Sequence, residues 1–513
     1  MDIFAYKLAI PVETSFGLAI SDEKMKNCIG SNFDTESYND YLNKLNQYLY
    51  LANEEYGLWQ KDQAGAKKKY EDSLFQIKSI LSVIEIPQRY IPFQTYNFFN
   101  NLLGTFIKCA NIQSRNIITC SSNDPDAKII KYSSSLLSLL SYFRDCREYL
   151  YNIELFQIIE GFLYGNSKPK MRKAPKIHVE YSNYLINTFA NFAADEEFHD
   201  KFTPVMFSYA LNEFSQTKSP EDYIIPLNFF INYFHYCHKD KDLSKTQYSN
   251  SSFFEEIIEM LGLFPCSRNL EKSRISDEIK KQIHIKSSCI IYALANLGYL
   301  PIDKFVEFGL HLFVKKYFLK YKFLMATVEC FAIYYKEHFP KLQINLEDLY
   351  NGLNTIADDQ EYLQISFLTI YNILKNCPNQ NEMLSSDLIP KIIIFIANEF
   401  EKKEYSTKLY SLTLLCFIYS KMPTSFYMQN ISIVFFLLDN CCLFISERDE
   451  VNNIIFNFLG VCHSFLENCG NINEFPALAC AYNRCLEVLS NSEEYFNEAQ
   501  INSLAPFDIP MNL

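Results

Sequence analysis

The residues of this sequence that could bind a metal ion are histidines and cysteines in predicted helices. His235 and His238 are three positions apart and share one helix face, with Cys237 between them, and imidazole with thiolate suits zinc. A closed zinc site needs four ligands, and no second cluster has a matching spacing. Cys462 and His463 lie in equally apolar helical sequence. Because a buried free cysteine behaves as a small hydrophobic residue, we predict structural cysteines and no metal site.

Two acidic runs could supply paired carboxylates for acid–base catalysis. Both Asp195-Glu196-Glu197 and Asp358-Asp359 fall in loops between predicted helices, where solvated acids are expected. A Cys–His nucleophile pair would assemble in space, but no local signature surrounds any cysteine. Neither G-x-x-x-x-G-K-[ST] nor G-x-G-x-x-G occurs, so these motifs give no support for nucleotide binding. We therefore expect no enzymatic activity and no cofactor.

The composition excludes several other classes of protein. The chain has 513 residues, a net charge of −13 and 49% hydrophobic residues, so it is neither disordered nor suited to bind nucleic acid. The 16 cysteines are spread through apolar segments, which predicts a reducing compartment. The N-terminus lacks the basic region of a secretory signal. The longest apolar stretch, 431–445, contains Asp439 and is too short to span a membrane, so we expect no membrane partner.

Apolar residues recur at the helical period through most of the chain, and strand-like alternation is scarce. A unit of apolar helix, short polar loop and second apolar helix is clearest at 183–212, 289–319 and 366–398. Weaker copies begin near Ser135, Pro226, Phe323, Ser406 and Val451. The mean spacing is about 45 residues, which is within the range of helical repeats. Since one such helix pair cannot bury its own apolar faces, the pattern predicts stacked repeats with a shared core.

One segment carries a specific resemblance to a known repeat. From Tyr292 to Gly298 the sequence is aromatic, Ala, Leu, small, Asn, aliphatic, small, with Asn296 at the amide position. This is similar to the last helix of an armadillo repeat, and 187–193 and 372–376 are looser copies. The chain thus resembles the armadillo/HEAT-type α-solenoid superfamily. The resemblance implies an all-α fold, a right-handed superhelical armadillo-like α-solenoid of about eight helical repeats with an N-terminal helical cap.

The resemblance also suggests a domain organisation. It covers roughly residues 130–490, and the helical sequence before it reads as a hairpin that would cover an open apolar end of the stack. We assign 1–125 to an N-terminal helical cap, 126–495 to armadillo-like repeats and 496–513 to a C-terminal tail. The alternative for the first region is a separate partner-binding module.

The family places asparagines of the last helix on a concave surface, where their amides bond the backbone of an extended peptide. The matching candidate residues are Asn187, Asn191, Tyr292, Asn296, Asn372 and Asn376. Nuclear-import adaptors of this family carry tryptophans beside these asparagines, whereas the single Trp59 lies outside the repeats. The resemblance therefore does not extend to their recognition of basic signals. The structural alternative is that the amides bond a helix end or a loop.

A basic run stands out in this acidic chain. It lies between two predicted repeats and comprises Lys168, Lys170, Arg172, Lys173 and Lys176. Two prolines keep it extended. It reads as a nuclear-localisation-like peptide, as a contact for an acidic partner, or as a solvated loop.

Together these observations predict a non-catalytic scaffold that binds a protein or peptide along the concave face. The net charge of −13 favours a basic partner, and we expect a cytoplasmic protein with nuclear location as an option. One alternative is a nuclear-transport or chaperone-type adaptor of the same fold. A second is an enzyme or a regulatory subunit of an enzyme complex.

Overall fold

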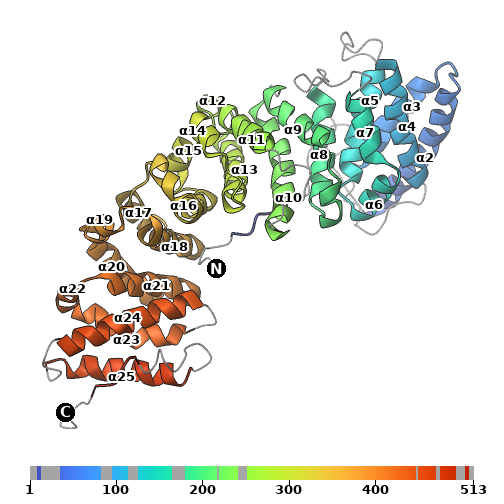
Figure 1. The fold of residues 1–513 in the computed structure, drawn as a ribbon. Helices are drawn as coiled ribbons and strands as arrows, with labels where there is room; N and C mark the ends of the chain where they lie inside the picture. The colour runs from blue at the N-terminus through green and yellow to red at the C-terminus, as the bar shows by residue number, and fades with distance from the viewer. Residues whose placement is uncertain are drawn as a thin grey trace. The chain divides into compact units, whose positions relative to one another are not determined.

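The computed structural model describes residues 8–12, 35–81, 95–113, 125–164, 179–216, 219–240, 251–445, 449–468, 474–492 and 503–507. Within these ranges every regular element is an α-helix or a short 3-10 helix (Figure 1), which confirms the predicted all-α class. None of the described helices is both long and apolar enough to cross a membrane. The chain divides into two compact units, the first comprising residues 9–293 and 303–308 and the second residues 1–8, 294–302 and 309–513.

The first unit contains most of the helices that precede residue 309. They are α2 (Thr35–Gln60), α3 (Ala66–Leu81), α4 (Thr95–Gln113), α5 (Pro125–Leu140), α6 (Arg144–Asn152), α7 (Leu155–Tyr164), α8 (Val179–Ala193), η2 (Glu196–Lys201), α9 (Pro204–Gln216), η3 (Pro220–Tyr223), α10 (Ile224–Asp240), α11 (Ser251–Leu263), α12 (Arg268–Lys272), most of α13 (Asp277–Asn296) and of α14 (Ile302–Glu307).

Four helices of this unit, α3, α5, α8 and α10, pack against one another in succession. Buried amides link them: Asn187 Nδ2 of α8 donates to Ser138 Oγ of α5 at 2.8 Å. Asn232 Nδ2 of α10 donates to the Ala190 carbonyl of α8 at 2.8 Å. Since a buried polar group costs free energy unless it is paired, these bonds fix the register between successive helices.

The second unit has the same kind of succession. Its helices are α15 (Leu310–Tyr317), α16 (Lys322–Tyr334), η5 (Lys336–Leu342), α17 (Leu346–Leu353), α18 (Gln360–Asn376), α19 (Gln380–Leu384), α20 (Leu388–Glu399), η6 (Phe400–Lys402), α21 (Tyr405–Lys421), α22 (Thr424–Gln429), α23 (Ile431–Cys441), η7 (Cys442–Phe444), α24 (Asp449–Asn468) and α25 (Pro476–Ser490). Helices α16, α18, α21 and α24 pack one on the next.

Helix α18 shows how the sequence determines where a helix begins and where it ends. It begins after Asp359, whose side chain accepts a hydrogen bond from the Tyr362 amide at 3.0 Å, as an N-cap does. It ends at Asn376, before Cys377 and Pro378, because proline lacks the amide hydrogen that a helix needs. All residues from 362 to 374 are buried, so the helix lies in the middle of the core. Asp359 therefore caps the N-terminus of α18, and it lies in a loop between helices, as the sequence predicts.

Candidate functional site

Most of the six residues predicted to line a concave face are buried. Asn187, Asn191, Tyr292 and Asn372 are each at most 3% exposed. Asn191 Nδ2 donates to Ser141 Oγ at 3.0 Å. The bonds of Asn187 and Asn372 are structural, but they differ from the predicted alternative of a bond to a helix end or a loop, because these amides join one helix to a neighbouring one. A peptide-binding role for these residues stays a prediction.

The remaining amides lie at helix ends. Asn296 closes α13 and Asn376 closes α18, and both are half-buried. The basic run from Lys168 to Lys176 lies outside the described residues.

One contact between a histidine and a cysteine lies in the first unit, between η2 and α10. His199 Nε2 lies 3.2 Å from Cys237 Sγ, an approach that the sequence did not suggest. The same nitrogen lies 3.1 Å from the Tyr233 carbonyl, which can only accept, so Nε2 carries the proton and cannot take one from the thiol. In the described residues, no group of three or more His, Cys, Asp or Glu side chains could hold a metal ion.

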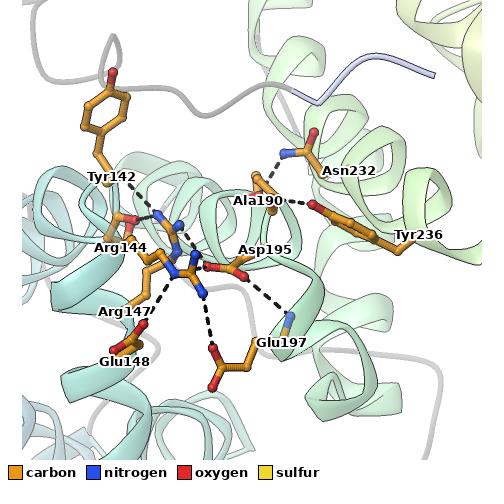
Figure 2. A network of polar contacts seen from close by, with 11 residues as sticks. Tyr142, Arg144, Arg147, Glu148, Ala190, Asp195, Glu197, Asn232 and Tyr236 are labelled. Carbon is orange, nitrogen blue, oxygen red and sulfur yellow. Dashed lines mark hydrogen bonds and ion pairs between the residues drawn. The ribbon is translucent and has the colours of Figure 1, made fainter. Parts of the chain in front are cut away.

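A charged network joins the turn after α5 to the turn after α8 (Figure 2). Arg147 points from α6 toward Asp195, and its Nη2 lies 3.1 Å from Asp195 Oδ2. Arg147 Nη1 donates to the carbonyls of Ser141 and Tyr142, at 2.9 and 3.0 Å, near the end of α5. Only 7% of the Arg147 side chain and 11% of the Asp195 side chain are exposed. Asp195 is therefore not the solvated acid that its loop position predicts, because an arginine 48 residues earlier reaches it.

The outer part of this network is exposed. Arg144 Nη2 lies 3.7 Å from Glu197 Oε2, and Arg144 Nε lies 3.3 Å from Glu148 Oε1. The Arg144 side chain is 64% exposed, so these ion pairs are weak and screened by salt. The recess of about 500 Å³ beside them is lined mainly by groups already paired with one another. We assign this network a structural role in holding the two turns together.

A groove of about 320 Å³ crosses three helices of the second unit that pack one on the next, α18, α21 and α24. Its floor is apolar and consists of Tyr371 of α18, Phe417 of α21 and Ile454 of α24, each at most 6% exposed. Its polar rim comprises Lys375, Gln380, Ser420, Lys421, Glu450, Asn453 and Asn457. Binding sites are usually concave, and this recess combines a small apolar floor with polar residues that make up most of its lining. We call this feature the α18–α21–α24 groove.

Two amides and one lysine of the rim are exposed at the surface and belong to none of the ion pairs described for the groove. Asn453 and Asn457 are exposed and lie four positions apart, on one face of α24. Lys421 is exposed, and its Nζ lies 6.0 Å from the centre of the Phe417 ring. Sequence reasoning missed these residues. The signal that could have found them is a pair of asparagines at helical spacing in the apolar sequence of α24.

One ion pair orders the groove wall. Lys375 Nζ and the Tyr371 hydroxyl both donate to Glu450 Oε1, the latter at 2.5 Å. Burial opposes ionisation of Glu450, but the hydrogen bonds from Lys375 and Tyr371 outweigh it, so the pKa of this carboxyl is lowered. Burial, together with the bond to Glu450, raises the pKa of Tyr371, which stays a donor.

This pairing predicts a pH dependence of stability. A carboxyl with a lowered pKa in the folded state stabilises the fold above its unfolded pKa of about 4.5, and that stabilisation is lost as the pH falls through the folded value. We expect Glu450→Gln to destabilise the chain at pH 7, and the difference from wild type to shrink below about pH 4.5. Urea unfolding at pH 7 and pH 3.5 measures it. The exposed Glu382→Gln is the control and should shift stability by less than about 0.5 kcal/mol at either pH.

The sequence matches no protein-family model and no curated protein. The geometry of the groove is therefore the basis for a function.

Proposed function

We propose that this chain is a non-catalytic scaffold that binds an extended segment of a partner protein in the α18–α21–α24 groove. The observation that carries the proposal is an apolar floor on three stacked helices with exposed amides beside it. An asparagine amide offers both a donor and an acceptor, so it can pair with the backbone of a segment in any sequence context. The floor then selects a side chain of suitable size.

The charges of the rim indicate which segment fits. The rim carries two lysines and one glutamate, and the glutamate already pairs with Lys375. The exposed ammonium of Lys421 is the group that a partner would meet, so the groove favours a segment with a carboxylate at that position. This differs from the basic partner that the net charge favours, because the local charge of the groove is opposite to that of the chain.

The proposal includes the finer fold assignment, an armadillo-like α-solenoid. Polar contacts between successive buried helices join residues 42, 49 and 50 positions apart in the first unit and 43 positions apart in the second. These separations support the predicted repeat of about 45 residues. Parallel helices that recur at one period present equivalent surfaces side by side, which is how a repeat protein forms an extended binding face.

The test begins with random linear peptides displayed on phage and selected on the full chain. Peptides retained by wild type are measured against the double variant N453A/N457A, in which both exposed amides of α24 are removed. We expect affinity to fall by about 30-fold, which corresponds to about 2 kcal/mol for two lost amide pairings. Circular dichroism should be unchanged, since both residues are exposed.

The matched control is Asn398→Ala, an exposed asparagine on α20, outside the residues that line the groove. It should bind the selected peptides as wild type does. Peptides that bind N453A/N457A as tightly as wild type would refute the proposed groove.

A further inference from the structure

Residues 8–12 form a short extended segment in which burial alternates. Leu8 and Ile10 are each 3% exposed, whereas Ala9 and Val12 are exposed. Leu8 belongs to the second unit and residues 9–12 to the first, so the burial of Ile10 is the part that concerns a surface of the first unit. Residues 8–12 are neither helix nor strand, and their sequence, Leu-Ala-Ile-Pro-Val, contains a proline that keeps the segment extended.

The Ile10 carbonyl contacts α10, which lies in the first unit together with residues 9–12. His235 Nδ1 lies 2.6 Å from the Ile10 carbonyl oxygen, across 225 positions of sequence. Because a carbonyl only accepts, Nδ1 carries the proton and donates. The short dark-blue segment beside α10 in Figure 1 shows this approach.

The donor is held in place by its neighbours. The His235 ring meets Tyr236 edge to face, with ring centres 4.7 Å apart. The Tyr236 hydroxyl in turn donates to the Ala194 carbonyl of the turn after α8, at 3.0 Å. The two residues that precede His235 on α10, Tyr233 and Phe234, are at most 1% exposed, so this part of the helix is tightly packed. A fixed donor and an aliphatic contact are the two elements of recognition of an extended peptide.

We propose that the α10 surface around His235 is a second binding site, for extended segments in which an aliphatic residue precedes proline, and that residues 9–12 occupy it in the free chain. The contact uses a backbone carbonyl and an aliphatic side chain, both of which any segment of this pattern can supply. A tethered occupant has a high effective concentration, so it weakens the binding of a competing segment and must be displaced by it. The site goes beyond the α18–α21–α24 groove and shares no residue with it.

The test uses a fluorescent peptide of residues 6–14, YKLAIPVET, and the full chain. In Ile10→Asp the tethered segment can no longer bury its side chain, so the site opens. We expect the peptide to bind this variant at least about 10-fold more tightly than wild type. Ile10→Ala removes most of the same contact without adding a charge and should give an intermediate affinity.

His235 variants show whether binding takes place at this site. In the Ile10→Asp background, His235→Phe keeps a ring but loses the donor and should lower peptide affinity by about 10-fold. His235→Asn retains a side-chain N–H at nearly the same position, so it should keep part of the peptide affinity that His235→Phe loses. Equal affinity of wild type, I10D and I10A, or full affinity of I10D/H235F, would overturn the proposal. N453A/N457A should not change this binding, so failure here and failure of the groove are distinguished.

Discussion

Replacing Arg147 by methionine is expected to lower the free energy of unfolding by about 3 kcal/mol. The guanidinium binds the Asp195 carboxylate and the carbonyls of Ser141 and Tyr142, and both charged side chains are nearly buried. Methionine fills a similar volume, but it leaves the nearly buried Asp195 carboxylate with only the longer contact to Arg144 Nε, at 3.7 Å, and the carbonyls of Ser141 and Tyr142 without this donor. Removing one partner of a buried pair costs more than the pair contributes, since the other charge stays desolvated.

The control for this prediction is a second arginine of the same network. Arg144→Met removes longer ion pairs from a side chain that is 64% exposed and should cost less than about 1 kcal/mol. Urea unfolding of both variants measures the difference. In the double variant R147M/D195N the cost should be smaller than the sum of the single costs, because the unpaired charge is gone. Equal effects of R147M and R144M would contradict a structural role for this network.

Asn372→Ala is expected to lower the free energy of unfolding by about 2 kcal/mol. Asn372 Nδ2 of α18 donates to Glu329 Oε1 of α16 at 3.0 Å, and the two residues are 3% and 1% exposed. The loss of this hydrogen bond leaves buried polar atoms with fewer partners, and an unsatisfied buried polar group costs about 1–3 kcal/mol. The result would show that this asparagine links successive helices.

Asn376→Ala, one turn later on the same helix, is the matched control and should change stability by less than about 0.5 kcal/mol. Both asparagines were predicted from the sequence as peptide contacts. If N372A unfolded at the same urea concentration as wild type, the amide would not be a structural link and a ligand-binding role would regain support.

The sequence predicted the elements better than their contacts. The all-helical class follows from the helical period of the apolar residues. The partner of Asn187 does not, because it depends on Ser138 lying at the facing position of a helix 49 residues earlier. An amide on a helix can face a neighbouring helix or solvent, and only packing decides which.

Because contacts depend on packing between helices, the sequence also could not predict the candidate functional site. The loop sequence around Asp195 predicts a solvated acid, because nothing in that loop shows that Arg147 reaches it. The floor of the α18–α21–α24 groove consists of residues from three helices that are far apart in sequence. Asn453 and Asn457 are binding candidates because they line the same groove as Phe417. Spacing within one helix can suggest such residues, but the apolar floor is a property of three-dimensional packing.

The central claim is that the α18–α21–α24 groove binds an extended segment of a partner. The most direct measurement is a crystal structure of the full chain with the tightest selected peptide. We predict a peptide that crosses α18, α21 and α24, with its backbone bonded to Asn453 or Asn457 and a carboxylate beside Lys421. A peptide bound on another surface, with the groove empty, would contradict the account.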